Sequence, residues 1–163
     1  MIPNTPEKAL ATLNTEGIYK VYFPKFDRIT NLHGEDYSRE YIRQCLVSLF
    51  SLEAKLFSQL ELASFKYYQD VEDCIGRDYL DKIINSATEI WQHVRPMYIY
   101  LERSQINPDN TFLAVTLSCD WDEEHGLFWL IKNTDEVMHV SPAGEYCSPD
   151  NKLSYQDGNY AGN

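Results

Sequence analysis

The order of apolar and polar positions predicts where the regular structure begins. Residues 1–16 alternate short polar and apolar stretches around two prolines, and we expect them to form a lead-in. Ile18–Phe23 is rich in β-branched and aromatic residues and stops at Pro24, which predicts a β-strand. The following stretch, residues 24–35, contains turn-forming residues and is expected to be a loop.

The pattern then changes to that of a helix over residues 36–75. This region holds no proline or glycine, and its apolar residues recur at steps of three and four, as on a helix with one buried face. Asp36 or Ser38 can serve as the N-cap. A helix of this length is unusual in a globular domain, so we expect a break near Ser51 or near Tyr67.

A further helix is predicted after Gly76, which suits a helix C-terminus. Asp78 is a good N-cap, and Asp81 lies in the first turn, where the helix dipole favours a negative charge. Apolar residues then follow on one helical face as far as Val94. Pro96 ends the pattern, because the residue before a proline disfavours helical geometry.

The last part of the chain shows the period of two that is typical of strands. Strands are predicted over residues 97–101, 113–119, 127–131 and 136–140, with a turn at 107–110. The strand 127–131 is apolar on both faces, which predicts a central position in a sheet covered by helices on one side.

Segregated helices and strands of this kind predict an α+β domain. We expect a single domain over residues 1–163, with about three helices packed on a mostly antiparallel sheet of four to five strands. Prolines and glycines dominate residues 142–163, which are expected to form an irregular tail.

The charge of the chain is unevenly distributed. The 163 residues carry a net charge of −11, but residues 1–66 are neutral, so the whole imbalance lies in residues 67–163. Such acidity argues against nucleic acid as the main partner, because phosphate contacts need clustered Lys and Arg. The simpler interpretation of this acidity is solubility, and the alternative is a partner that has a basic surface.

Cysteine usage and hydropathy bear on the compartment. Cys45, Cys74, Cys119 and Cys147 form no C-x-x-C pair and match no zinc spacing, and the first six residues do not resemble a secretory signal. We therefore expect reduced, mostly buried thiols and a cytoplasmic protein. The apolar runs are only a few residues long, so no membrane span is predicted.

One segment concentrates groups that could carry chemistry. Residues 119–127 join two predicted strands and hold four carboxylates and one imidazole within six residues. In a structural interpretation, Trp121 fills the core, Gly126 supplies an unusual backbone angle and the acids stay solvated. In a recognition interpretation, Trp121 is an exposed aromatic anchor for a basic partner, ringed by charged neighbours. These neighbours are Asp120, Asp122, Glu123, Glu124 and His125.

A metal site in this segment is only weakly indicated. Asp120, Asp122 and Glu124 have the alternating spacing that begins a calcium loop. Such a loop needs glycine at its sixth position and glutamate at its twelfth, where this chain has His125 and Ile131.

Other sites would need partners from elsewhere in the chain. A metal bound by His125 could recruit His93 or His139, and Cys119 with His125 or His139 could form a nucleophile–base pair. The sequence contains no G-x-S-x-G, Walker or H-E-x-x-H motif. We therefore assign no catalytic residue, metal ligand or cofactor.

A second acidic group is predicted near the end of the long helical region. Asp70 and Asp73 precede Gly76, and such a group is usually a solvated helix end but can add to an acidic binding surface. Tyr98 and Tyr100 are expected to pack in the core or at a sheet edge, since a base-stacking role would need neighbouring Lys and Arg.

Several of these residues resemble a bacterial family of unknown function. Phe65–Tyr68 on a helix, His93-Val94 at the end of another and the segment Cys119–Leu127 carry the resemblance, which covers roughly residues 60–142. The hallmark of that family is a C-terminal W-D-x-E-H-G-L segment, which here spans residues 121–127. Several members are thought to act as immunity proteins beside polymorphic or contact-dependent toxins, so the resemblance implies that role.

The leading hypothesis is therefore a non-enzymatic immunity protein that neutralises a cognate protein toxin with a basic surface. A metal-dependent or Cys/His enzyme using residues 119–126 is the main alternative, and an adaptor or structural subunit is another. The expected partner-binding residues are Asp120, Trp121, Asp122, Glu123, Glu124, His125, Asp70 and Asp73.

Overall fold

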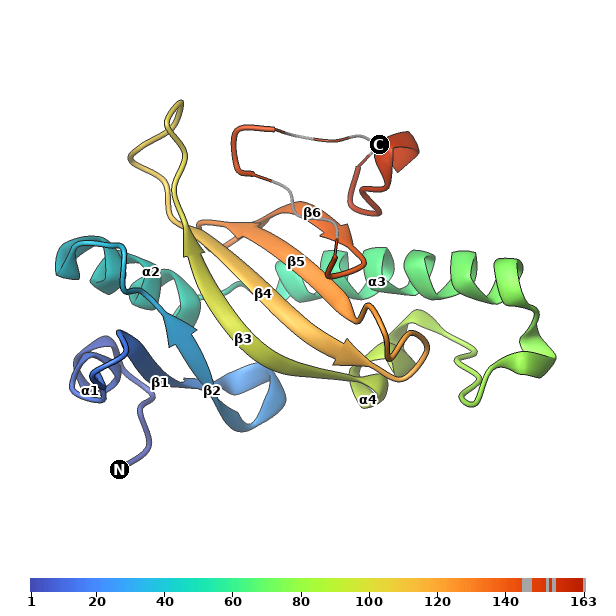
Figure 1. Ribbon diagram of the computed structural model, residues 1–163, viewed down its shortest axis with the longest axis horizontal. Helices are drawn as coiled ribbons and strands as arrows, with labels where there is room; N and C mark the ends of the chain where they lie inside the picture. Colours follow the sequence, from blue (N-terminus) through green and yellow to red (C-terminus); the bar gives the residue numbers. More distant parts are fainter. Residues whose placement is uncertain (145–147, 152, 154, 163) are drawn as a thin grey trace.

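A six-stranded sheet forms the framework of the computed structural model, which describes residues 1–144, 148–151, 153 and 155–162 (Figure 1). The strands follow one another across the sheet in chain order, and every neighbouring pair is antiparallel except β2 and β3, which are parallel. They are β1 (Ile18–Phe23), β2 (Arg28–His33), β3 (Val94–Glu102), β4 (Phe112–Cys119), β5 (Leu127–Lys132) and β6 (Glu136–Ser141).

Helices cover one face of this sheet, which confirms the α+β class. The α-helices are α1 (Pro6–Leu10), α2 (Arg39–Phe50), α3 (Ala54–Ile75) and α4 (Ile90–His93). The 3₁₀ turns are η1 (Pro24–Phe26), η2 (Arg77–Tyr79), η3 (Ala87–Glu89) and η4 (Tyr155–Asp157). The prediction of about three helices and four to five mostly antiparallel strands is therefore corrected: the described residues form four α-helices and a mixed sheet of six strands. None of the helices described is long and apolar enough to cross a membrane.

The long helical region divides into two helices at the first of the two predicted positions. Ser38 is the N-cap of α2, and its side chain accepts a hydrogen bond from the Tyr41 amide at 3.2 Å. Ser51 ends α2, and α3 begins three residues later. Gly76 ends α3 with a φ of 88°, a backbone angle at which a side chain is strained, so its predicted role as a stop is confirmed.

The helix predicted between Asp78 and Val94 is wrong. This stretch contains only η2, an irregular segment, η3 and the four-residue α4. The amide of the buried Ile84 donates to the Tyr68 hydroxyl of α3 at 3.1 Å, so it is not part of a helical ladder. Val94 already belongs to β3, in which Pro96 lies beside a shift in the register with β4. Tertiary contacts therefore override a helical spacing of apolar residues.

The loop predicted over residues 24–35 is also wrong, because it contains β2. The 3₁₀ turn η1 and Asp27, whose φ is 48°, turn the chain back from β1. β2 then pairs antiparallel with β1, and Thr30 and Leu32 are its buried positions. Only two residues of this strand are buried, and one of them, Thr30, is polar. The sequence of β2 therefore does not show the alternation of apolar and polar residues that predicts a strand.

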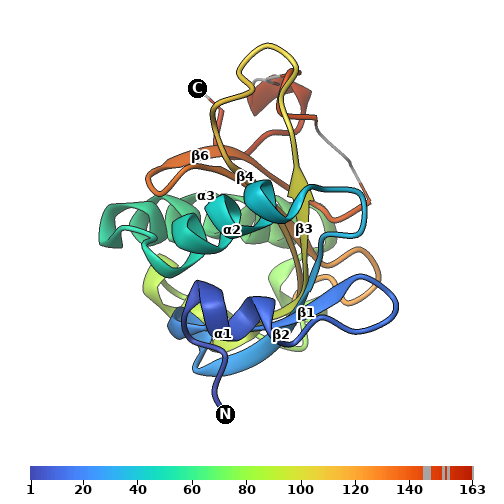
Figure 2. The same cartoon turned by 90° about the vertical axis from the view of Figure 1, so that its left-hand side faces the viewer.

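The main core lies between the inner face of the sheet and the helices α2 and α3. Figure 2 shows the sheet curving around these two helices, with β6 on one side of them and β1 and β2 on the other. Trp129 of β5 is completely buried, and its indole Nε1 donates to Ser64 Oγ of α3 at 3.0 Å. Ser48 of α2 is likewise hydrogen-bonded to Thr111 at 2.7 Å. These buried polar groups therefore keep their hydrogen bonds inside an apolar layer.

The ends of the chain pack against the edges of the sheet. In the lead-in, Ala9 and Leu10 of α1 are buried. At the opposite edge, the Tyr160 amide donates to the Val140 carbonyl of β6 at 2.8 Å, and the Asn159 side chain accepts from the Val140 amide at 3.0 Å. The described part of the tail is irregular apart from η4. It occupies edge groups that could otherwise pair with another strand.

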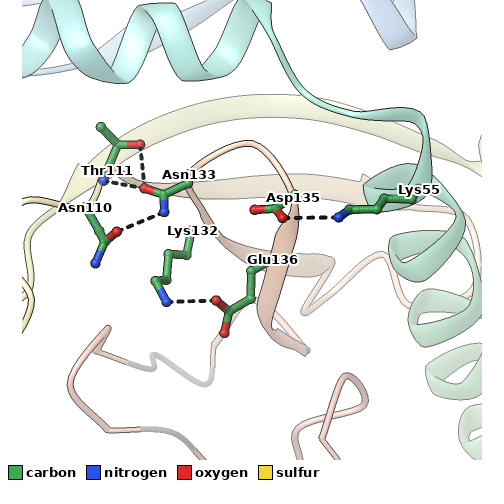
Figure 3. A network of polar contacts seen from close by, with 7 residues as sticks. All are labelled: Lys55, Asn110, Thr111, Lys132, Asn133, Asp135 and Glu136. Atoms are coloured by element: carbon green, nitrogen blue, oxygen red, sulfur yellow. Dashed lines mark hydrogen bonds and ion pairs between the residues drawn. The ribbon is translucent and has the colours of Figure 1, made fainter.

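The turn between β5 and β6 is fixed by a small polar network (Figure 3). Asn133 adopts a left-handed φ of 53°. Its Oδ1 accepts from the Thr111 amide at 3.0 Å, and its Nδ2 donates to Asn110 Oδ1 at 2.9 Å. Two ion pairs flank the turn: Lys132–Glu136 at 2.8 Å and Lys55–Asp135 at 3.2 Å.

We expect Asn133→Ala to lower the free energy of unfolding by about 2 kcal/mol, because it removes the hydrogen bonds of this side chain to Thr111 and Asn110 and strains the left-handed backbone. Asn133→Gly loses the same hydrogen bonds without the strain, and should cost about 1 kcal/mol. Lys55→Ala, which removes the exposed ion pairs of Lys55 with Asp135 and Glu53, should cost less than about 1 kcal/mol. Urea denaturation of the three variants measures this order, and an equal loss in all three would contradict it.

Candidate functional site

The segment between β4 and β5 is a tight turn that carries its tryptophan inward. Trp121 is only 5% exposed, and its indole packs edge to face against the rings of Tyr67 and Tyr68 of α3, with centroids 6.0 and 6.1 Å away. The prediction of Trp121 as an exposed anchor is therefore wrong. The turn lies over the end of the core, and the indole fills the space between the sheet and α3, as in the structural interpretation.

Gly126 closes this turn in a conformation that only glycine adopts easily. Its φ is 71°, and a Cβ at this position would lie 2.6 Å from the carbonyl oxygen of Leu117. The backbone role expected for Gly126 is thus confirmed.

Asp122 attaches the turn to α3. Its carboxylate accepts hydrogen bonds from the Tyr67 hydroxyl and from the His125 amide at 3.1 Å, and His125 Nδ1 lies 3.0 Å from each of its oxygens. Partial burial alone would raise the pKa of Asp122, but these donors outweigh it and hold the pKa below its usual range. The same contact and burial raise the pKa of the Tyr67 hydroxyl.

Asp120 attaches the turn to the beginning of β3. Its two oxygens lie 3.0 Å from His93 Nδ1 and 2.9 Å from Arg95 Nη1. Burial by itself raises the pKa of Asp120. The hydrogen bonds to Arg95 and His93 lower this pKa by more than burial raises it, so the net shift is downward. Its negative charge is therefore compensated by a guanidinium group at contact distance.

The remaining predicted residues divide between a cleft and the open surface. A cleft of about 360 Å³ lies between α3 and the turn, and Asp70, Trp121, Asp122 and His125 are among the residues that line it. The fold thus brings Asp70 to the turn, although more than fifty positions separate them in the chain. The side chains of Glu123, Glu124 and Asp73 are exposed and do not line the cleft.

The alternatives that use Cys119 find little geometric support. The Cys119 thiol is buried and donates to the Asp122 carbonyl at 3.4 Å, and burial raises its pKa to about 12. His139 packs against Phe128 in a separate apolar cluster, away from the core cluster that contains Cys119. In the part of the chain that the structure describes, no three His, Cys, Asp or Glu side chains are grouped to hold a metal ion.

The cysteines that the structure describes are free thiols. Cys45 and Cys119 are buried and Cys74 is exposed, whereas Cys147 lies outside the described residues.

A second cavity, on the outer face of the sheet, was missed by sequence reasoning. It measures about 390 Å³, and Tyr100 and His33 are among the residues that line it. Tyr98 and Tyr100, expected in the core or at an edge, are 38% and 40% exposed on this face of β3. The alternation of residues 97–101 places both rings on one face, but His33 could be placed beside them only once β2 was known.

We expect Asp122→Asn to lower the free energy of unfolding by about 2 kcal/mol at pH 7, because it weakens hydrogen bonds to a charged acceptor. The pKa of Asp122 is lower in the folded state, so its contribution is present above the unfolded pKa of about 3.9 and is lost as the pH falls through the folded value. The difference from wild type should therefore shrink below about pH 4. Glu123→Gln is the matched control, with a change within about 0.5 kcal/mol. Equal destabilisation of both variants would contradict the attachment role.

His139→Leu should instead stabilise the protein by about 1 kcal/mol at pH 7, because neither ring nitrogen of the buried His139 has a hydrogen-bond partner among the residues that the structure describes. Burial lowers the folded-state pKa of His139 to about 4, below the unfolded value of about 6.5. Wild type therefore loses stability as the pH falls from 6.5 towards 4, and the variant escapes this loss. The advantage of His139→Leu should grow over this range in denaturation curves, and a constant difference would contradict it.

Comparison with known proteins gives a family but no function. Neither the curated proteins nor the solved structures include a match to this chain. The model of a family described as a domain of unknown function, DUF6985, matches residues 15–147. This match includes the strands β1 and β2. The resemblance noted in the sequence covered only residues 60–142. The chain belongs to the DUF6985 family.

Proposed function

We propose that this protein is a non-enzymatic immunity protein that binds and neutralises a cognate bacterial toxin in the cytoplasm. The contact surface, here called the acidic surface, consists of residues 120–126 and the C-terminal half of α3. The observation that carries the proposal is the cleft in which Asp70 of α3 meets Asp122 and His125 of the turn. Two groups of acidic residues that are far apart in the sequence thereby form one surface.

The structure suggests a division of roles within the acidic surface. Asp120, Trp121 and Asp122 are held by side chains of β3, α4 and α3, so they fix the shape of the turn. Glu123 and Glu124 are exposed on this fixed turn and are positioned to meet a partner. A surface that is already ordered loses little conformational entropy on binding, which favours affinity.

The charge distribution supports a basic partner. Arg95 compensates the charge of Asp120, so Glu123, Glu124 and Asp73 supply exposed negative charge at the acidic surface. Toxins that act on nucleic acids carry basic active-site surfaces, and complementary fields accelerate encounter with such surfaces. The neutralising role itself follows from the resemblance to families with immunity proteins.

The state of Cys119 favours this role over the Cys/His enzyme. A nucleophilic cysteine needs an accessible thiolate, whereas the Cys119 thiol is buried with a pKa of about 12. His125, its proposed base, is instead placed against the carboxylate of Asp122.

Co-expression with the product of the neighbouring toxin gene tests the proposal. We expect wild-type protein to restore growth and to co-purify with the toxin. Glu123→Lys/Glu124→Lys should lower the association rate about tenfold at low salt, and the difference should diminish near 0.5 M salt, where exposed charges are screened.

The matched control is Glu16→Lys/Asp109→Lys, which changes the net charge equally at exposed positions outside the acidic surface. It should keep most of the wild-type rate. The proposed function is wrong if wild-type protein neither binds the toxin nor restores growth. If binding occurs but both double variants slow it equally, the acidic surface is not the contact site.

A further inference from the structure

We infer that the cavity on the outer face of the sheet binds a small organic cation that has an apolar body. This outer-face cavity crosses four strands, with His33 at the end of β2, Tyr100 on β3, Thr116 on β4 and Phe128 on β5. Its volume of about 390 Å³ is within the range of small-molecule sites. It shares no described lining residue with the cleft beside α3, so it is independent of the proposed toxin contact.

The walls of the outer-face cavity suit an apolar body. The rings of His33 and Tyr100 stack with centroids 4.8 Å apart and an interplanar angle of 24°. Tyr100 is 40% exposed, so its ring offers apolar area that a ligand could cover. The small side chains of Ala114 and Thr116 lie between these rings and Phe128 in the sheet, and they leave the space that larger residues would fill.

The rim of the same cavity supplies negative charge. Glu35, Asp36 and Glu102 all line it, and Glu35 and Asp36 are exposed. The pKa of Tyr37, another lining residue, is raised first by its own burial and then by the charges of Glu102 and Asp36. Arg103 opposes this effect at Tyr37 but does not cancel it.

The combination of these walls and this rim selects the ligand chemistry. An anion would be repelled by the three carboxylates, and a neutral apolar molecule would gain from the walls alone. An ammonium or guanidinium group on an aromatic or short alkyl body would use both, because it adds charge complementarity and contact with aromatic rings. The inference therefore concerns free small cations of this type.

Calorimetric titration with three probes of similar shape tests the inference. The probes are tyramine, its neutral analogue 4-ethylphenol and the anionic 3-(4-hydroxyphenyl)propionate. We expect tyramine to bind at least about tenfold more tightly than 4-ethylphenol, since each factor of ten needs only about 1.4 kcal/mol from the rim. The anionic probe should not bind.

Three variants place the binding in the outer-face cavity. Glu35→Gln/Asp36→Asn should reduce the affinity for tyramine to that for 4-ethylphenol, and Thr116→Trp, which fills the cavity, should abolish binding of both. Tyr100→Ala removes an exposed wall and should weaken both probes several-fold. The charge-matched control Asp78→Asn/Asp81→Asn changes exposed carboxylates that do not line the cavity, and it should bind tyramine as wild type does. Circular dichroism checks that each variant is folded.

Several results would overturn the inference. These are equal affinity for the three probes, no binding of tyramine at millimolar concentration, or unchanged binding in a folded Thr116→Trp protein. Binding of an arginine-containing peptide without binding of tyramine would also overturn it, because it would identify a protein-docking surface in place of a small-molecule site. None of these measurements depends on the toxin, so the inference and the proposed function fail separately.

Discussion

Adjacent parallel strands cannot be joined by a tight turn, and this constraint governs the arrangement of the whole molecule. β2 and β3 are parallel neighbours, so the chain that leaves His33 must return to the starting end of β2 before it enters β3 at Val94. That connection contains α2, α3 and α4, and α2 and α3 lie together within the curve of the sheet (Figure 2). The hydrogen bond from Trp129 to Ser64 anchors β5 to α3 inside this layer. Among the described residues no α-helix covers the opposite face of the sheet, and the outer-face cavity lies there.

The same connection explains why the turn after β4 is rigid. The second half of α3 lies beside the turn and supplies Tyr67 and Tyr68, which enclose the Trp121 indole. Tyr67 also donates to Asp122, so one helix provides both the apolar and the polar contacts of the turn. Asp120, Trp121 and Asp122 therefore hold the turn in place, whereas Glu123 and Glu124 beside them are exposed to solvent.

Local patterns predicted those elements in which buried residues recur with one regular spacing. Examples are the strand Ile18–Phe23 and the strands β3 to β6. The break between α2 and α3 at Ser51 was also among the predicted positions. The helix expected from Asp78 to Val94 failed because its apolar spacing was satisfied by contacts with α3 and by strand pairing, neither of which a local window contains. β2 failed because only Thr30 and Leu32 are buried in it.

The candidate sites were predictable only to the extent that they are local in the chain. The acidic turn is a single segment and was found, but the inward direction of Trp121 depends on a helix more than fifty residues earlier. Asp70 could be proposed as an acidic neighbour, yet only the packing of α3 brings it to the cleft with His125. The outer-face cavity joins residues of four strands, and one of these strands, β2, was not predicted from the sequence. The cavity could therefore not be predicted either.

Charge illustrates how the fold changes the meaning of a sequence pattern. Along the chain, the whole net charge of −11 lies after residue 66, which directs attention to the turn after β4. In the folded protein, Glu35 and Asp36 from the neutral part of the chain meet Glu102 at the rim of the outer-face cavity. Exposed charges act over roughly 8 Å at physiological salt, so the potential at a site depends on its spatial neighbours and hardly on the net charge of a segment. A cationic ligand at the outer face and a basic partner at the turn would therefore be attracted by different carboxylates, and each attraction can be removed without disturbing the other.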